Sequence, residues 1–123
     1  RKLDEIIDRR RQNAQSYLEY IEKEEVFIPR EKEYEFNTYH TFVIQVEKRN
    51  ELKEFLLKQG IEAAIHYPTP IHLQPAAKRL GYKLGDFPIT EKQAGMILTL
   101  PVNQSLGQSE IERICVAVNE YYS

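Results

Sequence analysis

Apolar residues near the N-terminus recur every three or four positions, which is the spacing of one face of a helix. The residues on this face are Leu3, Ile6, Ile7, Ala14, Tyr17, Leu18 and Ile21. Polar residues 9–12 fill the opposite face, so the pattern predicts one long amphipathic helix that ends near residues 22–25. We interpret the arginines at positions 9–11 as a solvated face or a subunit contact, because a nucleic-acid patch would not suit the acidic balance of the chain.

Apolar and polar residues alternate from position 39 to position 46, which is typical of a strand. His40, Phe42, Ile44 and Val46 share one face of it, and Thr41 and Gln45 share the other. We expect His40 to be a hydrogen-bonded residue near the edge of the core. Residues 61–65 predict a short second strand, and residues 96–100 predict a third strand that the following proline stops.

Helical signals fill the gaps between these strands. A helix is expected after Asn50, a good N-cap residue, and it should end at Gly60. Two short helices follow, one over residues 75–80 and one that begins at Pro88. The last helix carries an apolar stripe of Ile111, Ile114, Cys115, Val118 and Tyr122. This order predicts an α+β domain in which helices cover a small, mostly antiparallel sheet of about three strands.

The composition narrows the class of protein. A chain of 123 residues has the length of one domain, and 41% hydrophobic and 29% charged residues are typical of a globular protein. The net charge of -2 argues against nucleic acid or an anionic membrane surface as the main partner. No apolar run is long enough to span a membrane, and the first residues lack a signal-peptide pattern, so we expect a cytoplasmic protein. Because the chain opens on a helical pattern without an initiator methionine, we expect a piece of a larger protein.

The most distinctive segment runs from residue 65 to residue 74 and reads IHYPTPIHLQ. Its two prolines fix φ and exclude a regular helix or a central strand, so we expect a stiff loop that presents polar rings. Such loops commonly carry binding residues. His66 and Tyr67 offer donors and acceptors that suit sugar hydroxyls or phosphates. The alternative is that the rings only pin the loop by bonding to backbone carbonyl groups.

Other kinds of chemistry find little support in the residue pattern. His66 and His72 could bind a metal with Asp86 or Glu91 as a third ligand, but their spacing matches no metal motif, and we predict no metal site. The single cysteine, Cys115, cannot form an internal disulfide, and its place on an apolar stripe favours a small core residue. No serine nucleophile motif and no glycine-rich phosphate loop are present. The residues alone therefore contain no complete catalytic set.

Six stretches of the chain together resemble one known family. They are residues 2–10, 39–44, 60–76, 80–82, 85–91 and 98–102. In order and spacing they are similar to the C-terminal part of the DegT/DnrJ/EryC1/StrS sugar aminotransferases. These are pyridoxal-phosphate enzymes of the aspartate-aminotransferase fold type that act on nucleotide-linked keto-sugars. The loop most resembles members that make 3-amino-3,6-dideoxy sugars on a thymidine-diphosphate carrier.

The resemblance implies that residues 1–123 are a single C-terminal small domain. A large domain outside this chain would supply the lysine that binds pyridoxal phosphate. None of the lysines here lies in a matching motif, so we expect no catalytic and no cofactor-binding residue in this chain, which should be inactive alone. The resemblance also implies that His66 and Tyr67, and less directly His72, contact a nucleotide-sugar substrate.

Partners follow from the same resemblance. The full-length protein is expected to take an amino group from an amino acid, with glutamate as the expected donor. It is expected to be a homodimer whose subunits share each active site. The competing interpretation is a non-catalytic binding or regulatory module that keeps the fold without the chemistry. A large domain with a cofactor lysine upstream of this chain would decide for the enzyme.

Overall fold

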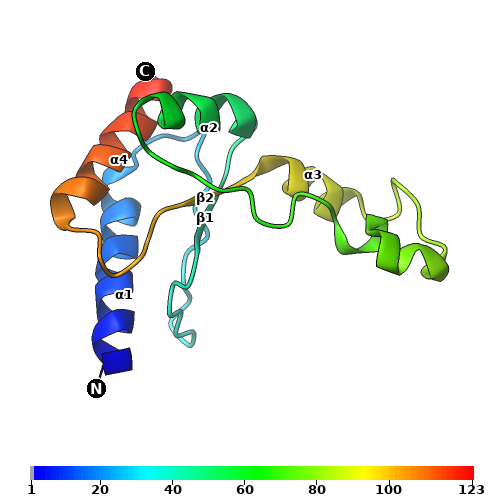
Figure 1. Cartoon of the computed structure of the whole chain (residues 1–123), viewed down its shortest axis with the longest axis horizontal. Helices are drawn as coiled ribbons and strands as arrows, with labels where there is room; N and C mark the ends of the chain where they lie inside the picture. Colours follow the sequence, from blue (N-terminus) through cyan, green and yellow to red (C-terminus); the bar gives the residue numbers. More distant parts are fainter. Residues whose placement is uncertain (1) are drawn as a thin grey trace.

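Two long helices lie across one side of a two-stranded sheet, and a slender arm extends from the other side (Figure 1). The computed structural model describes residues 2–123. Its elements in chain order are α1 (Lys2–Tyr20), β1 (Phe42–Gln45), α2 (Arg49–Lys58), the 3-10 helices η1 (Ile71–Leu73) and η2 (Pro75–Leu80), α3 (Pro88–Met96), β2 (Ile97–Leu100) and α4 (Gln108–Tyr121). The architecture is α+β, as the order of the sequence signals predicts.

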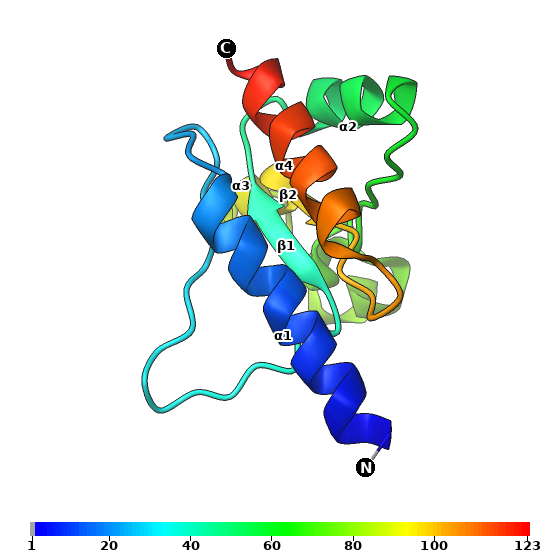
Figure 2. The same cartoon turned by 90° about the vertical axis from the view of Figure 1, so that its left-hand side faces the viewer.

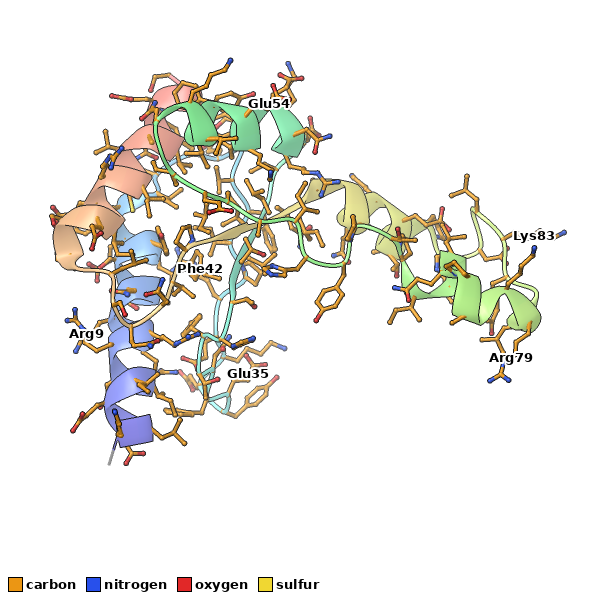
Figure 3. All side chains as sticks on the ribbon, viewed as in Figure 1. Arg9, Glu35, Phe42, Glu54, Arg79 and Lys83 are labelled. Carbon is orange, nitrogen blue, oxygen red and sulfur yellow. The ribbon has the colours of Figure 1, made fainter. Side chains whose placement is uncertain are left out.

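The sheet places its apolar side chains against the long helices. β1 and β2 pair antiparallel, with Phe42 opposite Leu100 and Ile44 opposite Leu98. These four side chains are buried on the face that α1 and α4 cover (Figure 2). The Tyr17 ring of α1 lies 4.7 Å from the Phe42 ring, which Figure 3 shows on the helix side of β1. The alternating apolar side chains of β1 therefore point into the core, as the sequence pattern predicts.

The second strand, expected over residues 61–65, is reduced to a single bridge. The Ala64 amide donates to the Thr99 carbonyl at 3.0 Å, and the Thr99 amide donates to the Ala64 carbonyl at 2.8 Å. On the N-terminal side of the bridge, the Ile61 amide donates to the Leu56 carbonyl near the C-terminal end of α2, and not to a strand. On the other side, the backbone turns away at Tyr67, whose φ is +58°. The sheet is small and antiparallel, as predicted, but it has two strands among the described residues.

Most helix boundaries lie close to their predicted positions. Gly60 follows α2 with φ of +75°, the left-handed conformation expected of a glycine after a helix. Asn50 is not the N-cap, because α2 begins one residue earlier; its side-chain oxygen accepts from Arg49 Nε at 2.7 Å. Cys115 is buried in α4, as predicted for a core residue. Within residues 2–123 we find no helix whose length and apolar character would let it cross a bilayer.

The prediction that His40 lies near the core is wrong. β1 begins at Phe42, two residues later, and the His40 side chain is exposed. Arg10 holds the backbone just before the strand, because its guanidinium donates to the carbonyl groups of Tyr39 at 3.2 Å and of His40 at 2.8 Å. Tyr39 has φ of +47° and turns the chain there, so the alternation starts only after this turn.

Residues 71–96 form the projecting arm, in which η1, η2 and α3 follow one another (Figure 1). The loop at its far end turns at Gly81 and Gly85, whose φ values of +78° and +96° are conformations that glycine adopts without strain. Arg79 and Lys83 lie at this far end, away from the body (Figure 3). The returning helix α3 leads directly into β2, so the arm is an excursion between the bridge and the sheet.

Candidate functional site

One ring nitrogen of His66 is hydrogen-bonded within the described residues, and the other is not. It lies two residues beyond the bridge at Ala64. A hydrogen bond of 2.8 Å joins its Nδ1 to Oγ1 of Thr99. Thr99 alternates along β2 with Leu98 and Leu100, which face the helices, so its side chain lies on the opposite face of the sheet. Nε2 of His66 makes no hydrogen bond within the described part of the chain.

Tyr67 presents its ring to solvent beside His66. Its side chain is 81% exposed, and the centroids of the two rings are 6.3 Å apart. Its φ of +58° is rare for a bulky residue, and Pro68 follows it. Strained positions of this kind persist only where the surrounding structure holds them, and they gather at functional sites. The loop therefore presents two adjacent rings, of which His66 is hydrogen-bonded to Thr99 and Tyr67 is exposed.

A hollow of about 270 Å³, lined by both polar and apolar residues, lies beside His66. Arg10, His40, Thr41, Glu62, His66 and Thr99 are among the residues that line it. The Arg10 guanidinium is already engaged in hydrogen bonds within the protein, because it donates to two backbone carbonyl groups and to Gln104 Oε1 at 3.1 Å. The His66 ring is both held in place and free at one nitrogen, so it is well placed to bind a polar ligand in this hollow.

His72 lies in a different hollow, in the arm. It is 9% exposed, and its Nε2 donates to Oε1 of Glu91 at 2.9 Å. The ring of Phe87 packs against it with 4.7 Å between centroids. His72 lines an apolar hollow of about 310 Å³ together with Tyr82 and Phe87. The structure thus brings His66 and Tyr67 together and places His72 at a separate position.

The Glu91 carboxylate accepts several hydrogen bonds from other residues of the arm. Besides the His72 ring, it accepts from the Gly85 amide at 2.8 Å and from the Phe87 amide at 3.3 Å. Burial alone would raise the pKa of Glu91, but the hydrogen bonds from Gly85, His72 and Phe87 lower this pKa overall. Glu91 therefore braces the arm as a carboxylate. Within residues 2–123, no group of three or more His, Cys, Asp or Glu side chains is arranged to hold a metal ion.

Sequence reasoning missed Thr99 and considered Glu91 only as a metal ligand. Thr99 is a hydroxyl residue in the otherwise apolar strand β2, and this interruption is the one signal that the sequence offers. Its pairing with His66 spans 33 residues and depends on the bridge at Ala64, which periodicity does not reveal.

Two other features lie away from the loop. Burial raises the pKa of the Cys115 thiol to about 12, so this cysteine is not a reactive nucleophile. A larger hollow of about 720 Å³ lies elsewhere, lined by Phe27, Met96 and Tyr122 among others. The buried hydroxyl of Tyr122 has no hydrogen-bond partner within the described residues. None of the predicted site residues lines this larger hollow.

Comparison with known proteins gives a family match along nearly the whole chain. Residues 1–119 match the DegT/DnrJ/EryC1/StrS aminotransferase family. A dTDP-3-amino-3,6-dideoxy-alpha-D-galactopyranose transaminase from Aneurinibacillus thermoaerophilus is 34% identical over 97% of this chain and 32% of its own length. A pleiotropic regulatory protein from Geobacillus stearothermophilus is 35% identical over 98% of this chain and 33% of its own length. The chain thus spans about a third of the length of the curated relatives it matches.

Solved structures share the fold. DesV from S. venezuelae matches with a TM-score of 0.91 and 30% sequence identity, over 96% of this chain and 32% of DesV. A DegT DnrJ EryC1 StrS aminotransferase from Brucella abortus matches with a TM-score of 0.85 and 28% identity, over 96% of this chain and 31% of that protein. The arrangement of helices, sheet and arm is therefore that of one third of these aminotransferase chains.

Proposed function

The chain belongs to the DegT/DnrJ/EryC1/StrS aminotransferase family, and we propose that it is the C-terminal small domain of an enzyme that aminates a nucleotide-linked keto-sugar. Relatives named as transaminases of dTDP-linked amino sugars support this proposal. The observation that carries it is the His66 ring, which lines a hollow and has the exposed Tyr67 ring beside it. The proposed substrate is a dTDP-3-keto-6-deoxy sugar, and the proposed amino donor is glutamate.

Pyridoxal phosphate is the cofactor of this family, and it would carry the amino group from donor to acceptor. Its attachment needs a lysine that forms a Schiff base. None of the residues that line the hollow beside His66 is a lysine, so this hollow does not fit the attachment of the cofactor. We propose that the rest of the full-length protein holds it.

The part proposed for this chain is orientation of the sugar nucleotide. A rigid loop that holds a substrate near a reacting group lowers the entropy cost of reaching the reactive geometry. His66 and Tyr67 would contact the substrate directly. His72 stays a prediction for the same wall, and its hydrogen bond to Glu91 supports a role in keeping the arm in shape. By family resemblance, two copies of the full-length protein would share each active site.

The substrate proposal is tested with the full-length protein that contains this chain. We expect amino transfer from glutamate to a keto-sugar on thymidine diphosphate, detected as amino-sugar product by mass spectrometry across a panel of dTDP- and UDP-linked keto-sugars. The 123-residue chain alone is the control and should give no product. Amino transfer to simple keto acids without turnover of any sugar nucleotide would contradict the proposal.

A regulatory module is the second candidate, because one relative carries the name pleiotropic regulatory protein. The two candidates differ in what the full-length protein must contain. A large domain with a cofactor lysine and turnover of any sugar nucleotide would favour the enzyme. A full-length protein without such a lysine, and without product from any member of the panel, would favour the regulatory module.

A further inference from the structure

A hydrogen bond of 2.8 Å joins Thr99 to His66, and its direction depends on which ring nitrogen of His66 carries the proton. We propose that Thr99 is a positioning residue that keeps this proton on Nε2, so that His66 offers a hydrogen-bond donor to an oxygen atom of the substrate. The nature of the ligand rests on the proposed function, whereas the place of the proton concerns this chain alone.

Both ends of this hydrogen bond are held by the sheet. Thr99 exchanges two backbone hydrogen bonds with Ala64, at 2.8 Å and 3.0 Å. His66 follows Ala64 by two residues, so the same bridge holds the segment that carries the ring. The β-branched side chain of Thr99 has few χ1 rotamers, which limits the places that Oγ1 can occupy. The distance of 2.8 Å between Oγ1 and Nδ1 is therefore a constrained feature of the fold.

Counting donors and acceptors selects one direction for the hydrogen bond. A threonine hydroxyl has one proton to donate, and a neutral imidazole has one donor nitrogen and one acceptor nitrogen. Thr99 is 8% exposed, and its hydroxyl has no other partner within the described residues. If His66 donated through Nδ1, the Thr99 proton would have no acceptor among the described residues, and an unpaired hydroxyl donor is unfavourable. If Thr99 donates instead, both groups are satisfied, and the ring proton is on Nε2.

The free Nε2–H defines the kind of atom that the ring can recognise. His66 is exposed and lines the hollow, so the donor is accessible to a ligand. An N–H donor pairs with an oxygen acceptor and not with an ammonium or amide N–H. One basic residue, Arg10, and one acidic residue, Glu62, are among those that line the hollow, a balance that gives an anion little advantage. This favours a hydroxyl or carbonyl oxygen of the sugar over a phosphate oxygen.

The proton position is measured on the full-length protein that contains this chain, by nitrogen-15 NMR with selectively labelled histidine rings at about pH 8, above the ordinary range of imidazole protonation. The signals of His66 are identified by their loss in His66→Ala. We expect wild type and Thr99→Ser, which keeps the hydroxyl, to show a protonated Nε2 and an unprotonated Nδ1. We expect Thr99→Val, which keeps the shape but removes the hydroxyl, to show a mixture of the two tautomers. Thr38→Val, on an exposed loop residue, is the matched control and should resemble wild type.

A kinetic measurement on the full-length enzyme gives the functional readout. Thr99→Val should lower kcat/KM for the sugar nucleotide by about three- to tenfold, the size expected for loss of one neutral hydrogen bond. The half-reaction with the amino donor should be unchanged, and Thr99→Ser should restore sugar use. A merely structural role for Thr99 would lower both half-reactions together.

The outcomes separate this inference from the proposed function. A wild-type His66 with its proton on Nδ1, or a Thr99→Val chain with the wild-type tautomer and wild-type sugar kinetics, would overturn the role of Thr99. A correct tautomer together with unchanged sugar use in His66→Ala would leave the chemistry of the pair standing and would instead remove the loop from the substrate site. If Thr99→Val does not fold, the wild-type and Thr99→Ser spectra still decide.

Discussion

The arginines of α1 show how single residues acquire roles that their sequence pattern does not reveal. Arg11 donates from two guanidinium nitrogens to the two carboxylate oxygens of Glu31, each at 2.9 Å, and to the Asn37 carbonyl at 2.6 Å. Its guanidinium also lies over the Phe36 ring, 4.5 Å from the centroid. The sequence predicted a solvated face or a subunit contact here. Arg11 fastens the following loop to the helix, a role that this pattern does not reveal, because a bidentate guanidinium can hold a carboxylate and a carbonyl together.

This pairing predicts a change in acid stability. The pKa of Glu31 is lowered to about 2 by its hydrogen bonds from Arg11 and from the Asn37 amide, compared with an ordinary value of 4.5. The folded state therefore binds fewer protons than the unfolded state between these values. The contribution of Glu31 to the free energy of unfolding is complete above about pH 4.5 and is lost as the pH falls toward about 2.

We expect Glu31→Gln to flatten this decline in urea denaturation measured across that pH window. Glu33→Gln, on an exposed residue of the same loop, is the control and should keep the wild-type slope. Because the Arg11–Glu31 pair is partly exposed, added salt should reduce the difference between Glu31→Gln and wild type. Equal slopes for wild type and Glu31→Gln would show that the ion pair does not contribute.

The candidate binding residues stand out in the sequence, but the residues that hydrogen-bond to them do not. His66 and Tyr67 stand out because prolines surround them, and prolines act locally on the backbone. The partner of His66 is Thr99, and the partner of His72 is Glu91, 19 residues away along the chain. Such pairings depend on how β2 and α3 are placed in space, which local spacing does not determine.

At the scale of elements, hydrophobic periodicity predicted which segments pack around the core. The apolar stripe of α4 and the alternation within β1 agree with the structure, because each of these elements buries one face in the core. The stripe of α1 agrees only in its second half, where Ala14 and Tyr17 are buried, whereas Leu3 at its start is exposed. Residues 61–65 were predicted as a strand from composition. They form one bridge only, because one end of the segment is bonded to α2 and the other end leaves at Tyr67. A strand needs a partner along its whole length, and the chain supplies one at a single position.

The arm depends on one carboxylate. Glu91 accepts hydrogen bonds from the His72 ring on η1 and from the amides of Gly85 and Phe87 in the loop at the far end. Hydrogen bonds to an ionised acceptor are stronger than neutral ones. The Glu91 side chain thus connects three parts of the arm, namely η1, the loop at the far end and α3 itself. Few other polar contacts among the described residues join these parts.

Glu91→Gln should loosen this arm without unfolding the body. We expect amide hydrogen exchange at Gly85 and Phe87 to become roughly tenfold faster, since these two amides lose an ionised acceptor. Exchange in α1 and α4 should stay as in wild type. Lys92→Gln, a change of charge at an exposed neighbour on α3, is the control and should leave the exchange unchanged. Protection at Gly85 that is equal in wild type and Glu91→Gln would remove Glu91 from this bracing role.

At the scale of the whole molecule, the two faces of the sheet differ. Helices α1 and α4 cover one face and close the core (Figure 2). The other face carries Thr99 with the His66 ring, and the arm extends from the same region (Figure 1). Several apolar side chains of the arm are exposed, including Ile71, Leu84 and Ile89. This arrangement supports our proposal that the uncovered side of the sheet faces the rest of a longer protein.

The central claim is that the loop of His66 and Tyr67 holds the sugar nucleotide while residues outside this chain carry out the chemistry. The most direct measurement compares the two half-reactions of the full-length enzyme in wild type and His66→Ala. We predict that kcat/KM for the keto-sugar nucleotide falls by about tenfold, the size of one lost hydrogen bond and ring contact, and that the half-reaction with the amino donor is unchanged. Equal sugar kinetics in the two proteins, or an equal loss in both half-reactions, would contradict this claim.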